Sequence, residues 1–195
     1  DPAYPDGQSN IEPIIIDMNS VGSIYTVPSG KNLYITNYHQ ATTINSWLKL
    51  EIENSDANTN LPSSADGMIQ YGASFVTGGH NFERPLIVGQ NKWVKKQETE
   101  PNNATLIGYL VDALVDPITW DLQKGSYTVP SGKVLCITNW SSSSSGSYLY
   151  VDGFKLYSGP SNWCNNCPSL GPQQESALDQ IIYVNEAKVV SGGST

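Results

Sequence analysis

Apolar and polar residues alternate along several short stretches of the chain, and turn-forming residues separate these stretches. In residues 32–38, Leu33, Ile35 and Asn37 fall on one face of a period-two pattern, and the residues between them fall on the other. Residues 134–140 follow the same period. A period of two indicates β-strands with two different faces. With 17 Gly and 12 Pro residues to form turns, the pattern predicts an all-β chain.

One stretch of this pattern occurs twice. The sequence Tyr-Thr-Val-Pro-Ser-Gly-Lys starts at Tyr25 and again at Tyr127, and the match continues to the end of the following apolar stretch. The copies differ only where Val134 replaces Asn32 and Cys136 replaces Tyr34. We expect a short strand, a turn at Pro-Ser-Gly and a second strand in each copy, as in a β-hairpin. A spacing of 102 residues is far longer than a solenoid repeat and predicts a duplicated domain.

Further segments correspond between the copies. Asp66-Gly67 and Asp152-Gly153 each lie between apolar runs, which predicts tight hairpins. The strand before the second hairpin, 148–151, corresponds to 47–52, with an insertion at 54–65. Residues 13–17 match 117–121, which predicts one more strand in each copy.

Strands at these intervals are typical of sandwiches and jelly rolls. We therefore predict two tandem antiparallel β-sandwich domains, jelly-roll-like and related by internal duplication. The first domain is expected at residues 11–113 and the second at 114–195. Residues 1–10 contain Pro, Gly, Gln, Ser and Asn without periodicity, so we expect an N-terminal arm there.

The last strand of the first domain has no counterpart in the second. Candidate strands at 85–88 and 92–96 match 181–184 and 188–190, but nothing matches 105–111. An unpaired strand edge must be covered or it recruits a partner. The chain's own arm, a neighbouring molecule's arm, or a strand shared between the domains would each account for the gap, and so would an edge blunted by Lys188.

Composition excludes several classes of partner. The net charge is −8 and the pI about 4.5, which opposes binding to nucleic acid and to anionic membrane surfaces. No stretch approaches the length of about 20 apolar residues that a membrane helix needs. We interpret the start at Asp1, in place of Met, as a mature, processed chain.

The three cysteines favour an extracellular setting. Cys164 and Cys167 lie in a loop rich in Ser, Asn, Pro and Gly, where we expect a local disulfide. A redox pair would need a βαβ context, and a zinc site would need two further ligands. Cys136 falls mid-strand, where we expect a buried or half-buried thiol. A loop disulfide and few charged residues point to the cell surface or beyond.

Catalytic and metal-binding patterns are lacking in the sequence. His39 and His80 are its two histidines, and no nucleophile elbow or phosphate-binding loop is present. Asp56, Asn58 and Asn60 begin like a calcium loop, but the required Gly and the closing Glu are missing. We expect no catalytic residues, no metal site and no cofactor, and weak calcium binding stays open.

Aromatic residues and two sequons are the remaining candidates. The second copy contains a cluster of aromatic residues. Such a cluster can form a sugar-binding platform, or its rings can pack between neighbouring strands. Trp163 lies in a loop and is the best candidate for an exposed contact. Two sites fit the N-glycosylation pattern. The candidate residues are Trp140, Tyr148, Tyr150 and Trp163 for ligand contact and Asn103 and Asn139 for glycosylation.

The Tyr-Thr-Val-Pro-Ser-Gly-Lys stretch, the apolar strand ending in Thr-Asn and the Asp-Gly hairpin resemble a repeat of secreted and surface-attached bacterial proteins and of some phage fibre-like proteins. The resemblance implies a non-enzymatic extracellular β-sandwich module. We expect a structural or adhesive homo-oligomer or polymer assembled by strand-edge pairing. The alternatives are a carbohydrate-binding module that takes glycans and a viral capsid or fibre protein.

Overall fold

The regular elements of this chain are β-strands. The computed structural model describes residues 11–20, 23–40, 48–53, 68–71, 78–96, 104–120, 122, 125–142, 147–158 and 174–194. Throughout these ranges the strands form antiparallel sheets, which confirms the predicted all-β class. No helix in these ranges is long and apolar enough to cross a membrane. The chain divides into two compact units, Asp1–Thr119 and Trp120–Thr195, called here the first and second units.

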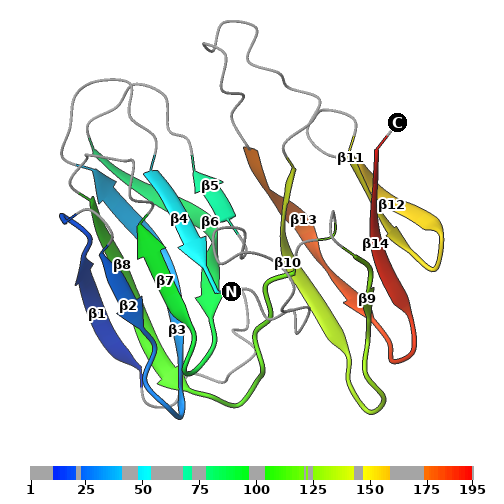
Figure 1. The fold of residues 1–195 in the computed structure, drawn as a ribbon, viewed down its shortest axis with the longest axis horizontal. Coiled ribbons are helices and arrows are strands. Elements are labelled where there is room, and N and C mark those ends of the chain that lie inside the picture. The colour runs from blue at the N-terminus through cyan, green and yellow to red at the C-terminus, as the bar shows by residue number, and fades with distance from the viewer. Residues whose placement is uncertain are drawn as a thin grey trace, which may run out of the picture. The chain divides into compact units, whose positions relative to one another are not determined.

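The first unit contains two four-stranded sheets (Figure 1). In one sheet, the order is β1 (Glu12–Asp17), β8 (Ala104–Asp112), β3 (Lys31–Gln40) and β6 (Gly78–Val88). In the other, it is β2 (Ile24–Thr26), β7 (Trp93–Lys96), β4 (Leu48–Ile52) and β5 (Met68–Tyr71). Both sheets supply side chains to one buried apolar cluster, Leu33 and Leu106 from the first and Leu50 and Val94 from the second.

A β-bulge changes which residues of β3 face this cluster. Leu33 and Ile35 are buried in it as the alternation predicts. The pairing register then shifts between Ile35 and Asn37. The extra residue reverses the alternation, so Tyr38 joins the cluster. The expectation that Asn37 shares the face of Leu33 and Ile35 is therefore wrong.

The second unit also contains two sheets, of four strands and of two. The four-stranded sheet has the order β12 (Phe154–Ser158), β11 (Ser147–Val151), β14 (Val189–Ser194) and β9 (Tyr127–Thr128). The two-stranded sheet pairs β10 (Leu135–Ser142) with β13 (Gln174–Val184). The fully buried cluster among the described residues of this unit has four members, Val129, Leu149, Val184 and Val190. Among the described residues of the first unit, the cluster has fourteen members.

The Asp-Gly hairpins agree with the sequence pattern as far as the structure describes them. β11 and β12 pair across Asp152 and Gly153, which have φ values of 49° and 77°. Two consecutive positive φ angles are what a two-residue hairpin turn requires. β4 pairs with β5 as expected, although Asp66 and Gly67 lie outside the described residues.

The match between residues 13–17 and 117–121 does not produce two strands. Residues 13–17 lie within β1, but residues 117–120 form no strand. The difference lies in strand pairing, because β1 is paired with β8 along its length, whereas no described strand pairs with residues 117–120.

Each Pro-Ser-Gly turn carries the chain from one sheet to the other. β2 and β3 belong to different sheets, so the expected hairpin between them is wrong, and the same holds for β9 and β10. The turn at 28–31 closes with the Lys31 amide donating to the Pro28 carbonyl at 3.2 Å. Val27 then exchanges backbone hydrogen bonds with the turn at 89–92, donating to Lys92 and accepting from Asn91 at 2.9 Å each.

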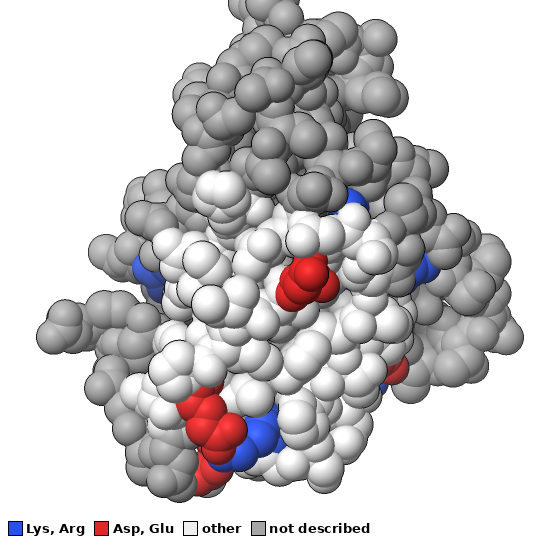
Figure 2. Space-filling model, turned by 90° about the vertical axis from the view of Figure 1, so that its left-hand side faces the viewer, with Lys and Arg blue, Asp and Glu red and all other residues white. Residues whose placement is uncertain are grey.

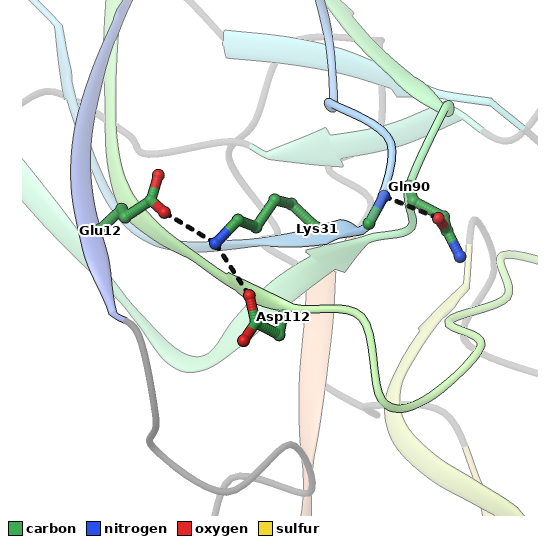
Figure 3. Close-up of polar contacts among 5 residues, drawn as sticks. Glu12, Lys31, Gln90 and Asp112 are labelled. Atoms are coloured by element: carbon green, nitrogen blue, oxygen red, sulfur yellow. Dashed lines mark hydrogen bonds and ion pairs between the residues drawn. The ribbon is translucent and has the colours of Figure 1, made fainter.

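The turn at 89–92 carries the chain back between the same two sheets, because it joins β6 to β7. Its Gln90 side chain accepts a hydrogen bond from the Gly30 amide at 2.8 Å (Figure 3). We call two such hydrogen-bonded turns a turn pair. The turn pair therefore holds together the two turns through which the chain passes between the sheets of the first unit.

The second unit contains the same turn pair. The Lys133 amide donates to Pro130 at 3.2 Å, and Val129 exchanges backbone hydrogen bonds with Lys188 and Ala187. Here Glu186 occupies the place of Gln90, and its carboxylate accepts from the Gly132 amide. The repeated sequence segment thus forms the same turn in both units.

The turn pair predicts a stabilising substitution. Ala187 and Asn91 hold the same left-handed position, with φ values of 61° and 60°, which costs Ala more than Gly or Asn. Ala187→Gly should raise the free energy of unfolding of the second unit by about 1 kcal/mol, measured by urea denaturation. Asn91→Gly is the matched control and should change stability by only a few tenths of a kcal/mol. A loss of stability in Ala187→Gly would contradict this account.

Candidate functional site

The edge of β10 opposite β13, called here the β10 edge, is the candidate site. In the first unit, β3 pairs with β6 on one edge and with β8 on the other, from Lys31 to Gln40. β10 pairs with β13, and no strand in the described ranges pairs with the β10 edge. The two-stranded sheet is visible in Figure 1. A row of backbone N–H and C=O groups therefore lacks a neighbouring strand in the described part of the chain.

β3 and β10 share an irregularity as well as a sequence. Along β3, the β6 partner moves from Leu86 to Asn81 as β3 passes from Ile35 to Asn37. Along β10, the β13 partner moves from Ile182 to Ala177 between Ile137 and Asn139. The register against the neighbouring strand thus shifts at the same place in both copies.

The face beside the edge is covered in the first unit and open in the second. Asn32 is 0% exposed and Tyr34 is 1% exposed. Asn32 donates its side-chain amide to the Val115 carbonyl at 3.0 Å. The Tyr34 ring stacks on Tyr109 of β8, with centroids 5.3 Å apart and planes 6° from parallel. β8 and the segment after it therefore bury this face of β3.

The corresponding residues of the second unit are exposed. Val134 is 57% exposed, and Tyr183, which pairs with Cys136, is 67% exposed. Cys136 is a free and exposed cysteine, so the expectation of a buried or half-buried thiol is wrong. The physical reason is that no strand like β8 lies beside it among the described residues. Partial desolvation still raises the pKa of the Cys136 thiol.

The sequence contained a signal of this difference that the strand pattern alone did not reveal. The two positions at which the copies differ, Asn32/Val134 and Tyr34/Cys136, are those that β8 and the following segment cover in the first unit. Substitution is therefore concentrated where the surroundings of the two copies differ. Tyr183 was not singled out, because an apolar strand pattern does not show which face is open.

Ion pairs hold the ends of these sheets. In the first unit, Lys31 of β3 contacts Glu12 of β1 at 2.7 Å and Asp112 of β8 at 2.9 Å (Figure 3). The hydrogen bonds to Glu12 and then Asp112 raise the pKa of Lys31. In the second unit, the hydrogen bond from Lys188 at 2.6 Å, followed by that from the Val189 amide, lowers the pKa of Asp152.

A second exposed apolar patch lies on β1 and β8. Ile15 pairs with Ile107, and the two are 73% and 40% exposed. The side of the molecule on which these strands lie shows few charged side chains (Figure 2). β1 is an edge strand of its sheet, and β8 is paired on both sides.

The candidate aromatic residues pack on their own surroundings where they are described. Tyr148 and Tyr150 meet edge to face, with centroids 6.3 Å apart and planes at 69°. Lys155 lies over the Tyr148 ring at 3.1 Å from its centroid. A Cβ atom added to Gly193 would come within 2.7 Å of the Tyr150 ring, so this ring covers the β14 backbone. These contacts favour cross-strand packing over a flat sugar-binding platform.

Several predicted residues lie outside the described part of the structure. Trp140 and Asn139 lie in β10, but their side chains are outside the described part of the structure. The other candidates lie wholly outside the described residues, namely Trp163, Cys164, Cys167, Asn103 and the calcium-like residues 56–60.

The described side chains do not bring metal ligands together. Within the ranges that the structure describes, no three His, Cys, Asp or Glu side chains gather closely enough to hold a metal ion. His39 is exposed at the far end of β3, opposite Thr105. His80 lies in β6 opposite Tyr38.

Comparison with protein-family models, with curated proteins and with solved structures finds no match. The function is therefore argued from the chain itself.

The turn pairs predict a pH dependence that differs between the units. Hydrogen bonds from the Gly132 amide and then from the Ser131 hydroxyl lower the pKa of Glu186. A lowered pKa contributes stability above the ordinary Glu value of about 4.3, and this contribution is lost as the pH falls through the folded-state pKa. Glu186→Gln should therefore reduce the loss of stability between pH 7 and pH 3, measured by urea denaturation.

The other unit supplies the reciprocal test. Gln90→Glu places a carboxylate in the turn pair of the first unit, where the Gly30 amide donates to it, and should create such a pH dependence there. Equal pH profiles for Glu186→Gln and the parent protein would contradict the assignment.

Proposed function

We propose that this chain is a non-enzymatic structural or adhesive protein of the extracellular space or cell surface. It consists of two tandem β-sandwich modules that arose by internal duplication. It assembles into a fibre or surface array by pairing the β10 edge with a strand of another molecule. The observation that carries the proposal is the β10 edge, which no described strand covers although β8 covers the same edge of β3.

Three features support the duplication. The strand order β2-β7-β4-β5 of the first unit corresponds to β9-β14-β11-β12 in the second. The turn pairs use the same backbone hydrogen bonds. The register shifts of β3 and β10 fall at the same place. The buried cluster shared by both sheets of the first unit supports the sandwich arrangement.

The open edge supports assembly because of its chemistry. A strand edge offers unsatisfied N–H and C=O groups along its length, and an added strand satisfies them while burying apolar side chains on both faces. Val134 and Tyr183 add exposed apolar area beside the edge. Tyr127 and Leu135 are only partly buried next to the small core of the second unit.

The non-enzymatic part of the proposal rests on the sequence, which has two histidines and none of the familiar nucleophile or phosphate-binding motifs. The extracellular part rests on the low fraction of charged residues and on the expected disulfide of Cys164 and Cys167. The contacts of Tyr148 and Tyr150 favour packing, so carbohydrate binding is not carried forward as a second function.

The proposal predicts self-assembly that depends on the β10 edge. Light scattering and negative-stain imaging of the native protein should detect large regular assemblies. Cys136→Lys and Val134→Lys put a charge beside the edge at exposed positions, where the fold tolerates it, and should raise the concentration needed for assembly at least about tenfold, because lysines block strand pairing.

Two controls separate this edge from other surfaces. Ile15→Lys changes an exposed apolar residue of the first unit and should leave assembly unchanged. Cys136→Ser removes the thiol without adding charge and should also assemble. A native protein that stays monomeric, or assembly that is indifferent to both β10 substitutions, would refute the proposed function.

A further inference from the structure

We infer that the β10 edge binds an extended peptide segment with the residue pattern of β8, supplied by another polypeptide chain. The inference rests on the proposed assembly function and deepens it by naming the chemistry and register of the partner strand. The first unit provides the template, since β8 occupies the same edge of a strand with nearly the same sequence.

The template fixes the register. β8 runs antiparallel to β3 and places Leu110 opposite Leu33, Gly108 opposite Ile35 and Leu106 opposite Tyr38. Transferred to β10, these partners stand opposite Leu135, Ile137 and Trp140. The incoming strand therefore needs apolar residues at its first and third contact positions, where Leu110 and Leu106 join the core of the first unit.

The middle position requires glycine. A Cβ atom on Gly108 would lie 2.1 Å from the Tyr34 carbonyl oxygen, next to the register shift that follows Ile35. β10 has its register shift at the equivalent place, between Ile137 and Asn139. A residue with a side chain opposite Ile137 would therefore meet backbone, which cannot move aside as a flexible side chain can.

The glycine requirement argues against pairing of the β10 edge with a described edge strand of a second copy. In the described part of the chain, the strands at the sheet edges are β1, β6, β2, β5, β10, β13, β12 and β9. None of these has a glycine inside the strand, and β6 has its glycines only at its first two positions. An edge-to-edge contact between two copies would therefore meet the bulge with a side chain.

The chain's own arm fits no better. Residues 1–10 include Pro2 and Pro5, which lack the backbone N–H that a strand donates. They also lack the alternating apolar residues of β8. The segment that fits is one with the pattern of β8, in which Leu106, Gly108 and Leu110 hold the three contact positions.

The outer face adds a second requirement. Opposite Tyr34, β8 supplies the stacked ring of Tyr109. β10 has the smaller Cys136 at that position, exposed and free. A large residue of the partner strand would cover this thiol and the neighbouring apolar surface. Because one residue of the bound strand lies directly opposite Cys136, a crosslink to this thiol would reveal the register in which the strand pairs with β10.

The test uses a synthetic nine-residue peptide with the sequence of Ala104–Asp112, added to the full chain. The peptide should bind and slow hydrogen exchange at those β10 amides that do not bond to β13. A peptide carrying Gly108→Val is the matched control and should bind at least about tenfold more weakly, because its side chain meets the β10 backbone.

Disulfide trapping then locates the peptide. With an added thiol oxidant, a peptide carrying Tyr109→Cys should form a disulfide with Cys136, because directly opposite residues of antiparallel strands lie within disulfide range. A peptide carrying Leu110→Cys points its thiol to the other face and should not crosslink. Cys136→Ser in the protein should abolish the crosslink, which distinguishes the β10 edge from exchange with β8 in the first unit.

Three results would overturn the inference: absence of binding, equal binding of the glycine and valine peptides, or β10 amides that are already protected in the chain alone. The assembly measurements decide the proposed function separately. If the protein assembles through the β10 edge but ignores the peptide, the proposed function stands and the partner chemistry is wrong.

Discussion

The backbone hydrogen bonds between paired turns are the constraint on which both units depend. Val27 and Val129 each donate to one residue of the opposing turn and accept from another. Each turn joins strands of different sheets, so these bonds hold together the two places where the chain crosses between layers. A buried crossing would otherwise leave amide and carbonyl groups unsatisfied, at a cost of about 1–3 kcal/mol for each group.

Because the turn pairs position the strands in the same way, β3 and β10 form a natural comparison. Both have the same apolar pattern and the same register shift, yet β3 is enclosed by β6 and β8 while β10 pairs with β13 alone among the described strands. Burial follows the neighbours: Tyr34 is covered by Tyr109, and Cys136 is exposed. The exposure of a strand residue is thus a property of the whole sheet.

Much of the strand content was predictable because it depends on local chemistry. Alternating apolar residues marked β3, β10 and β11, and Asp152-Gly153 marked the β11–β12 turn through its two positive φ angles. The hairpin expected between β2 and β3 was wrong because a Pro-Ser-Gly turn can either reverse the chain within one sheet or pass it to another. Local sequence contains no information about which sheet receives the next strand.

The sequence by itself determined the class of fold, the repeated turn and the lack of a match to Thr105–Val111, since these follow from periodicity, turn residues and self-similarity. Tertiary structure decided the rest. It alone placed Tyr38 in the core, because a bulge reverses the alternation, and it alone exposed Cys136, because burial depends on the strand next door. The β10 edge depended on both. The sequence indicated that the second copy lacks one strand, and the order of strands in the sheets showed that β10 is the strand without that neighbour.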